Sequence, residues 1–468
     1  MKINSIERRM FKINVLEDFA VIKTINDTIE LNDLTVFMGD NSAGKSYLAM
    51  LIHAFITMTR GYDDPDFLKA VLSKFKSTHL VKYLNTSIGN ILSIDNKKLL
   101  ITFEEEDLKD LKDIIYFSVN DYLVKKYLVD KLFKSNNLKK IEIELNQLVK
   151  RLPKKLSISH EKKDSNTLIT IIIDKKTAIL DFQGEVPGDN IKRQILEIVI
   201  SLLVESTIKG TLPVDSVYLP ASRTGYLQTY KILANKAVVN RYTTSDDNEI
   251  NQLSIIISFF INQLNSSTDF KENKFAEYIE NFIMGGRVNI YKDSSDIDFE
   301  LSNGNKIDLN LLSSTVSELI PLVVFLKRGL IKRNGLLVIE EPEAHLSFKN
   351  QKLIAKLITL LLQNNIKVLI TTHSDFLIYE LNNLIMKDTL HKNKEHISED
   401  IKELLKDEIS LDYRKVSLYN FTLKNENSII DKVEINKYGI NNKYIFDSTY
   451  AITDEKNRLL DAMDLIDV

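Results

Sequence analysis

The chain has 468 residues, of which 44% are hydrophobic, and a chain of this size can bury at least one large core and form two or three structural units. Although 27% of the residues are charged, the formal net charge is only -3, which excludes a polybasic nucleic-acid binder and an acidic tail protein. The sequence contains no cysteine, so disulfides, thiolate zinc sites and cysteine nucleophiles are excluded.

The first predicted elements are strands. Apolar and polar residues alternate from Phe11 to Phe37, with turn-forming Asn-Asp pairs at 26–27 and 32–33, and this pattern predicts an antiparallel sheet that runs into a buried strand. The segment GDNSAGKS follows at 39–46, and the apolar residues of SYLAMLIHAFITM then recur at helical spacing. The sequence therefore predicts a strand, a glycine-rich loop and a helix.

This loop has the pattern of a phosphate-binding loop. Gly39 and Gly44 would let backbone N–H groups turn toward phosphate oxygens, and the helix that follows adds its positive N-terminal end. Lys45 would neutralise the β and γ phosphates, and the Ser46 hydroxyl would bind Mg²⁺. The alternative is an ordinary glycine turn before a helix. The predicted nucleotide-binding residues are Gly39, Asn41, Ser42, Ala43, Gly44, Lys45 and Ser46.

Residues 61–210 have a different character, with few glycines and many lysines. Helical spacing runs from Leu108 to Leu132, LITIIID and TAILDF predict paired strands, and NIKRQILEIVISLLVES predicts a helix, so we expect a mostly helical insertion with a strand pair. Ten lysines and arginines between 125 and 155 could contact nucleic-acid phosphates. Interleaved acids, such as Asp130 and Glu142, favour the alternative of a solvated helix face.

Strands and helices alternate again from Asp215. The predicted order is the strand DSVYL, helices from Glu249 to Met284, the hairpin RVNIYKDSSDIDFELSNGNKIDL, a helix that opens in LLSSTVSEL, and the strands GLLVIEE and KVLITTHS with a helix between them. Such alternation predicts an α/β fold with a parallel sheet covered on both faces. The tail from about Glu395 has charged helices and a short hairpin, KVSLYNFTLKNENSIIDKVEIN.

Two glutamates and a histidine follow the last two predicted strands of the sheet. Glu340 would hold Mg²⁺ through water, and Glu341 would orient and deprotonate the attacking water. His373, where the next strand ends, could hydrogen-bond the γ phosphate. The alternatives are solvated acids at a strand end and an ordinary core or surface histidine.

Taken in order, GDNSAGKS, LLSSTVSEL, LLVIEEPEAHL and LITTHSDFL resemble the ABC-type ATPase heads of the SMC and overcoming-lysogenization-defect (OLD) families, including the Septu and PARIS phage-defence ATPases. The resemblance covers Phe11 to about Arg60 and Asp215 to about Asn383. It implies an ABC-ATPase head with a parallel core sheet and an antiparallel N-terminal sheet, divided into residues 1–60 and 211–394 by the insertion at 61–210 and followed by the tail at 395–468.

The resemblance also implies the cofactors ATP and Mg²⁺ and a homodimer or higher homo-oligomer. In that family, the segment that Ser313–Glu318 resembles reaches across the dimer to the γ phosphate, which makes Ser313 and Ser314 nucleotide-binding residues by resemblance. Two positions depart from the family pattern: Thr315 stands where glycine is usual, and Glu340 where aspartate is usual. Without the resemblance, LLSSTVSEL predicts a helix N-cap with a capping box.

The segment YLPASRTGYLQTY also resembles a segment that follows the insertion in such ATPases. Arg223 could contact phosphate or the opposite subunit, and Gln228 could replace the glutamine that senses magnesium. The alternative is a strand-ending turn with a surface arginine.

The motifs favour a Mg-dependent ATPase, and the resemblance implies that it dimerises around ATP and controls a separate nuclease or toxin in bacterial phage defence. The alternatives are an OLD-like nuclease, although the tail shows no TOPRIM or HNH pattern, and a transporter motor or a DNA-repair or condensation ATPase. The apolar runs are too short to cross a bilayer and the N-terminus lacks a signal-peptide segment, so we expect a cytoplasmic protein without membrane contact.

Overall fold

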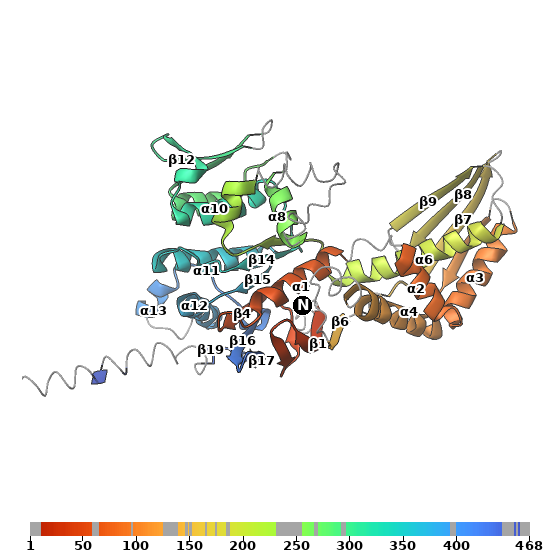
Figure 1. The fold of residues 1–468 in the computed structure, drawn as a ribbon, viewed down its shortest axis with the longest axis horizontal. Coiled ribbons are helices and arrows are strands. Elements are labelled where there is room, and N and C mark those ends of the chain that lie inside the picture. Colours follow the sequence, from red (N-terminus) through yellow and green to blue (C-terminus); the bar gives the residue numbers. More distant parts are fainter. Residues whose placement is uncertain are drawn as a thin grey trace, which may run out of the picture. The chain divides into compact units, whose positions relative to one another are not determined.

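The computed structural model describes residues 11–58, 65–94, 97–124, 139–145, 148, 152–163, 166–173, 176–183, 188–230, 255–265, 270–291, 296–393, 399–441, 454 and 457–458. The chain divides into two compact units (Figure 1). The first unit comprises Met1–Arg8, Ala20–His53 and Val214–Val468, and the second comprises Arg9–Phe19 and Ala54–Pro213. No described helix has the length and apolar character that crossing a bilayer requires.

A mainly parallel sheet forms the centre of the first unit. Its strand order is β10-β14-β15-β4-β16-β17-β2. All pairs from β10 to β16 are parallel, β16 and β17 form an antiparallel hairpin, and β17 pairs with β2 in parallel. The strands are β10 (Ser216–Leu219), β14 (Leu336–Glu340), β15 (Lys367–Thr371), β4 (Leu34–Gly39), β16 (Val416–Lys424), β17 (Asn427–Val433) and β2 (Ile22–Ile25). The predicted α/β fold with a parallel core sheet is confirmed.

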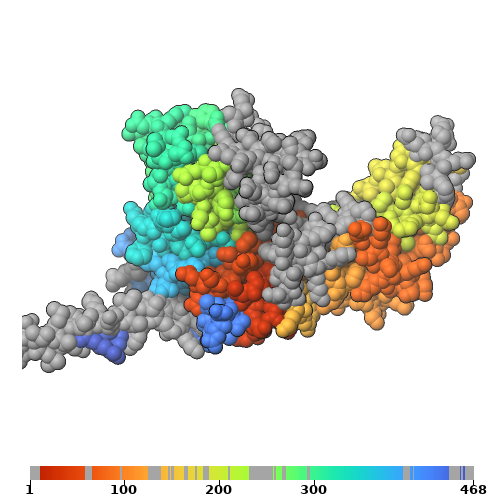
Figure 2. All heavy atoms as spheres, viewed as in Figure 1, coloured from red at the N-terminus to blue at the C-terminus, as the bar shows by residue number. Residues whose placement is uncertain are grey.

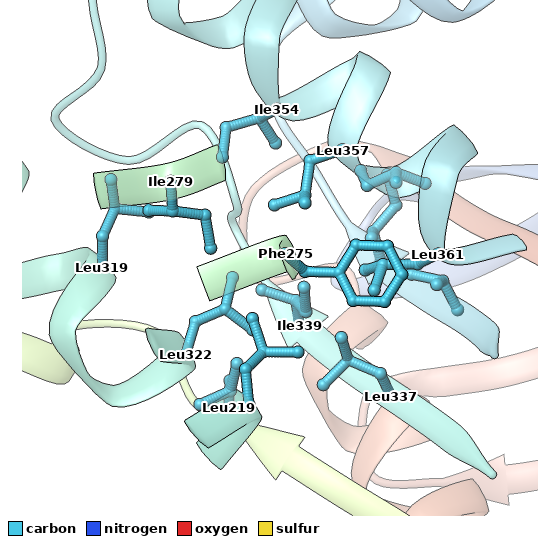
Figure 3. Packing of buried hydrophobic residues seen from close by; sticks show 14 of the residues in the cluster. Leu219, Phe275, Ile279, Leu319, Leu322, Leu337, Ile339, Ile354, Leu357 and Leu361 are labelled. Carbon is cyan, nitrogen blue, oxygen red and sulfur yellow. The ribbon is translucent and has the colours of Figure 1, made fainter. Parts of the chain in front are cut away.

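The central strands are buried along almost their whole length because both faces of the sheet are covered. All five residues of β14 are buried, as are the first five of β4. The helices of this part of the fold are α1 (Lys45–Met58), α8 (Ile255–Leu264), α9 (Lys274–Ile279), α10 (Ser314–Lys327), α11 (Phe348–Gln363) and α12 (Asp375–His391). Leucine, isoleucine and phenylalanine side chains from α9, α10, α11, β10 and β14 interdigitate in one core cluster (Figure 3). Each such side chain contributes about 1.5–3 kcal/mol by leaving water.

A small antiparallel sheet, β11 (Gly286–Ile290), β12 (Ile297–Leu301) and β13 (Lys306–Ile307), confirms the predicted hairpin. With α11 it forms part of the surface of the first unit on the face that Figure 2 shows. A buried ion pair joins this sheet to the end of α10, because Lys327 Nζ lies 2.7 Å from Glu280 Oε1 and donates to the carbonyl of Val288 at 2.8 Å. The short π-helix Glu280–Met284 carries the acid of this pair.

The second unit combines helices with an antiparallel sheet. The helices are α2 (Pro65–Phe75), α3 (His79–Leu92), α4 (Glu105–Phe117) and α6 (Gly188–Thr211), and the sheet has the order β5 (Lys97–Thr102), β7 (Lys155–Lys163), β8 (Asn166–Ile173), β9 (Lys176–Gln183). The predicted strand pair is β8–β9, and β5 and β7 add two strands that the sequence did not predict. Leu128 and Leu132 lie outside the described residues.

The first strand of the chain also belongs to the second unit. Strand β1 (Phe11–Phe19) pairs antiparallel with β6 (Lys140–Leu145). Lys139, one of the lysines considered for nucleic-acid contact, pairs with Asp18 at 2.6 Å. Because part of the basic stripe, residues 125–138, lies outside the described residues, the nucleic-acid interpretation stays a prediction.

The tail contributes to the core of the first unit. After α13 (Glu399–Leu404), the predicted hairpin is present as β16–β17. Residues Val416–Phe421 of β16 pair with β4, the strand that leads into the glycine-rich loop. This pairing is non-local, so nothing in the hairpin sequence itself indicated it.

Candidate functional site

The glycine-rich loop joins the end of β4 to the start of α1, as predicted. Gly39 and Gly44 adopt positive φ values of 111° and 93°, a region that glycine enters without strain. A Cβ atom at Gly39 would lie 2.2 Å from the carbonyl oxygen of Phe421 in β16, and one at Gly44 would lie 2.7 Å from a side-chain carbon of Ile22. Both glycines are therefore required by conformation and by space.

Lys45 is almost completely buried and turns back over the loop. Its Nζ atom donates to the carbonyl oxygens of Gly39 at 2.9 Å and Asp40 at 2.5 Å. Burial lowers the pKa of Lys45 to about 8, and the charges of Glu341, Asp40 and Glu343 oppose that effect. An anion bound at the loop would add its negative charge to that of Glu341, Asp40 and Glu343 and would stabilise the charged form of Lys45.

Binding of a polyphosphate should depend on pH through Lys45. Below pH 8 the ammonium form is already present, whereas above pH 8 binding must first return a proton to Lys45. We therefore expect the Kd for ATP to rise by up to about tenfold per pH unit above pH 8. Fluorescence titration of a labelled nucleotide from pH 7 to 9.5 measures this. Lys45→Arg, which stays charged over this range, is the control, and an equally flat profile for the unmodified chain would contradict the assignment.

Glu341 and His373 come together at the ends of neighbouring strands. Glu341 directly follows β14, has a φ of 44°, and donates its N–H to the carbonyl of Thr371 at 2.9 Å. His373 follows β15 and places Nε2 4.0 Å from Glu341 Oε1. Burial lowers the pKa of His373, the charge of Lys45 lowers it further, and Glu341, Glu343 and a hydrogen bond with the backbone of Gly39 oppose this. The ring is therefore neutral at neutral pH and can donate one N–H.

Glu340 is the last residue of β14, and its carboxylate turns toward the loop after β10. Oε2 accepts a hydrogen bond from the N–H of Ala221 at 3.0 Å, and the nearby carboxylate adds to burial in raising the pKa of Tyr218. Oε1 is buried without a hydrogen-bond partner among the described residues. Such an oxygen fits a water molecule of a hydrated Mg²⁺ ion.

No group of three acidic or histidine side chains in the described part of the chain is arranged to hold a metal ion. Mg²⁺ is commonly held by one or two carboxylates together with substrate phosphates. Ser46, the second residue of α1, is half-buried beside Lys45.

Glu343 is a site residue that the sequence did not identify. Its Oε1 atom accepts hydrogen bonds from Thr372 Oγ1 at 2.6 Å and from the N–H of His373 at 2.9 Å. Its Oε2 atom is buried without a partner among the described residues. Glu343 thus fixes the segment that carries His373. Its position two residues after Glu341 was the available signal, but its contact with the next strand depends on the fold.

The start of α10 carries Ser313 and Ser314, the two residues that the resemblance made nucleotide-binding. Ser313 is the N-cap, and its Oγ accepts from the N–H of Val316 at 3.4 Å. No described hydrogen bond or ion pair joins Ser313 or Ser314 to the glycine-rich loop. The predicted N-cap is confirmed, but the capping box is wrong, because the helix starts too early for Glu318 to reach the cap.

Thr315 takes part in a contact within the chain. Its Oγ1 atom donates to the carbonyl oxygen of His345 at 2.6 Å and ties the start of α10 to the segment that follows Glu341. The side chain that replaces the usual glycine is therefore engaged by the chain's own backbone.

The sequence is similar to a known family of ATPase domains. A profile of the AAA ATPase domain matches residues 16–378, more than half of the chain. The chain belongs to the AAA ATPase domain family. The matched residues of this ATPase domain include the glycine-rich loop, α10, both glutamates and His373. No curated protein matches the sequence.

Several solved structures align with most of this AAA ATPase chain at low similarity. The SMC head domain from Thermotoga maritima is 12% identical, with 92% of this chain and 100% of that chain covered and a TM-score of 0.31. An SMC head bound to the C-terminal winged-helix domain of ScpA is 10% identical, with 92% and 98% covered and a TM-score of 0.36. The Smc head with an extended coiled coil bound to the C-terminal domain of ScpA, derived from Pyrococcus furiosus, is 11% identical, with 96% and 100% covered and a TM-score of 0.33.

The segment after the insertion contributes two further residues of the AAA ATPase domain, Arg223 and Gln228. Arg223 is 2% exposed and pairs with Glu318, so it is neither a surface residue nor free to contact phosphate. Gln228 lines a hollow together with Tyr291, Asp298 and Asp308, next to the β11–β13 sheet. The lining of this hollow does not include the residues around Lys45.

Proposed function

We propose that the chain is a Mg-dependent ATPase that dimerises around ATP and controls a separate effector, a nuclease or toxin, in bacterial phage defence. One observation supports the catalytic part. Lys45, Glu341 and His373, which are far apart in the sequence, meet at the ends of β4, β14 and β15. The negative charge of Glu341 acts to raise the pKa of Lys45, and His373 lies 4.0 Å from Glu341.

The residues have distinct tasks in this proposal. Lys45 leaves the carbonyls of Gly39 and Asp40 and binds the β and γ phosphates, while the loop amides contact the phosphate oxygens. Glu341 accepts the proton of the attacking water, and neutral His373 donates its N–H to the γ phosphate. Ser46, together with Glu340 through a water molecule, would hold Mg²⁺, which would supply positive charge to the phosphates.

The dimer and the effector are supported less directly. Ser313 and Ser314 are exposed at the start of α10, without described hydrogen bonds to the loop of their own chain, as expected if they serve the nucleotide of a second copy. The effector and the phage-defence setting are supported by the resemblance of the four motifs, in this order, to phage-defence ATPases.

Three measurements on the purified full chain test the proposal. We expect Mg-dependent ATP hydrolysis, an ATP-dependent dimer in light scattering, and no DNA cleavage with Mg²⁺ or Mn²⁺. Lys45→Ala is the matched control and should lose both hydrolysis and dimerisation, because the loop then has no cation for the phosphates. DNA cleavage by the chain alone would favour an OLD-like nuclease. Absence of ATP hydrolysis and of an ATP-dependent dimer would contradict the proposal.

A further inference from the structure

A buried arginine connects α10 to the end of strand β14. Arg223 is the first residue of a helical segment that follows the loop after β10, and its Nε atom is 3.1 Å from Glu318 Oε2 on α10. The two side chains are 3% and 2% exposed. The Glu318 carboxylate is fully used, since it also accepts from the N–H of Arg223 at 3.2 Å and from the N–H and Oγ1 of Thr224 at 3.1 and 2.9 Å.

The rest of the guanidinium group contacts backbone carbonyls. Nη1 donates to Glu340 at 2.6 Å and to Pro220 at 3.0 Å, and Nη2 donates to Glu341 at 3.3 Å. Nε donates in addition to the carbonyl of Glu318 at 3.0 Å. The donors of a planar guanidinium group, fixed in direction, thus join the loop after β10, helix α10 and the segment that carries the proposed general base.

The segment that Arg223 contacts is strained. Glu341 has a φ of 44°, a left-handed conformation that is unfavourable for a residue with a side chain. Hydrogen bonds at both of its peptide groups hold this conformation: its N–H donates to Thr371, and its carbonyl accepts from Ala344 N at 3.0 Å and from Arg223. The direction in which the Glu341 side chain leaves the strand therefore depends on these bonds.

The surroundings make the arginine hard to replace. Leu219, Leu319, Leu322 and Ile339 line the space beside the ion pair, and they belong to the core cluster of Figure 3. Water cannot readily take over the role of a lost donor in such a place. A lysine has three donors on one atom and cannot reach carbonyls on three segments in fixed directions at once.

We propose that Arg223 is a positioning residue for Glu341: it holds the strained Glu341 peptide and, through Glu318, makes the placement of that carboxylate depend on α10. This inference rests on the proposed ATPase function. It assigns Arg223 no contact with the nucleotide. It predicts that damage to the pair lowers kcat and leaves ATP affinity unchanged.

Arg223→Lys tests the proposal against a matched variant. A displacement of about 1 Å in a catalytic group can lower the rate by about 100-fold, so we expect kcat to fall by roughly that factor while the Kd for ATP changes less than about threefold. Lys327→Met is the control, because it breaks another buried ion pair on the same helix, at the end away from Glu341. It should lower Tm in the same way as Arg223→Lys and leave kcat unchanged.

A second variant covers the case in which Arg223→Lys does not fold. Glu318→Gln keeps the shape of the side chain and the acceptor for Thr224 and removes the charge, and we expect kcat to fall at least about tenfold at unchanged Kd. If either variant folds and retains kcat while only Tm falls, the role of the pair is structural and the inference is wrong. Should the unmodified chain hydrolyse no ATP, the proposed function fails instead.

Discussion

Glu341→Gln is expected to lower kcat for ATP hydrolysis by roughly 10²–10⁴-fold, the contribution of a well-placed general base. The amide has the shape of the carboxylate but cannot accept the proton of the attacking water. Glu341 is also the carboxylate with the largest effect on Lys45, so the substitution should lower the pKa of Lys45 further below its ordinary value. Nucleotide affinity should change little at a pH well below the pKa of Lys45, because the charged Lys45 and the loop amides are retained.

The same substitution should trap the proposed dimer. If hydrolysis is what separates the two copies, ATP persists in the Glu341→Gln variant and an ATP-bound dimer accumulates. Light scattering with ATP and Mg²⁺ measures this state, and single-turnover hydrolysis gives the rate. Glu277→Gln, at an exposed position of α9, is the control for removal of a negative charge. Turnover at the unmodified rate without a stable dimer would exclude Glu341 as the general base.

The candidate site was predictable where its parts are local in sequence. The glycine-rich loop can be recognised from the sequence, because it requires glycine at 39 and 44 and a lysine and a hydroxyl residue at fixed spacing. A strand precedes it and a helix follows it. Glu340, Glu341 and His373 could be placed near it because parallel strands end at the same edge of a sheet. For the same reason, the alternation of strands and helices predicted the α/β fold.

The remaining contacts depend on the fold. Glu343 reaches Thr372 and His373 only because β14 and β15 are neighbours, and the sequence gives no register for that pair. Arg223 looked like a surface residue because arginine in a turn usually is one, and its burial follows from the carboxylate of Glu318 on a distant helix. The hairpin of the tail could be predicted as a hairpin, but not as the neighbour of β4, because strand pairing across the chain has no local signal.

A substitution at Gly39, which packs against strand β16, is expected to have the second large effect on ATP binding. Gly39→Ala would place a methyl group 2.2 Å from the carbonyl oxygen of Phe421, on a residue with a φ of 111°. Since β16 is fixed by its pairing with both β4 and β17, the backbone of the loop must move instead of the strand. We expect ATP binding to weaken by at least about 100-fold, because the loop amides lose their shared direction, and Tm to fall by several degrees.

Substitutions at two other glycines distinguish the steric clash from the conformational cost as the cause of weaker ATP binding. Gly304→Ala introduces a side chain at a φ of 85° with nothing within 4 Å, so it carries the conformational cost without the clash. Gly225→Ala has an open position and no positive φ, so it should be close to neutral. Isothermal titration with ATP and thermal unfolding of the three variants then assign the loss. Weak binding in Gly39→Ala, with normal binding in the other two, ties nucleotide affinity to the close packing of the loop against β16. Normal binding in Gly39→Ala would mean that the loop reaches its phosphate-binding shape without that packing.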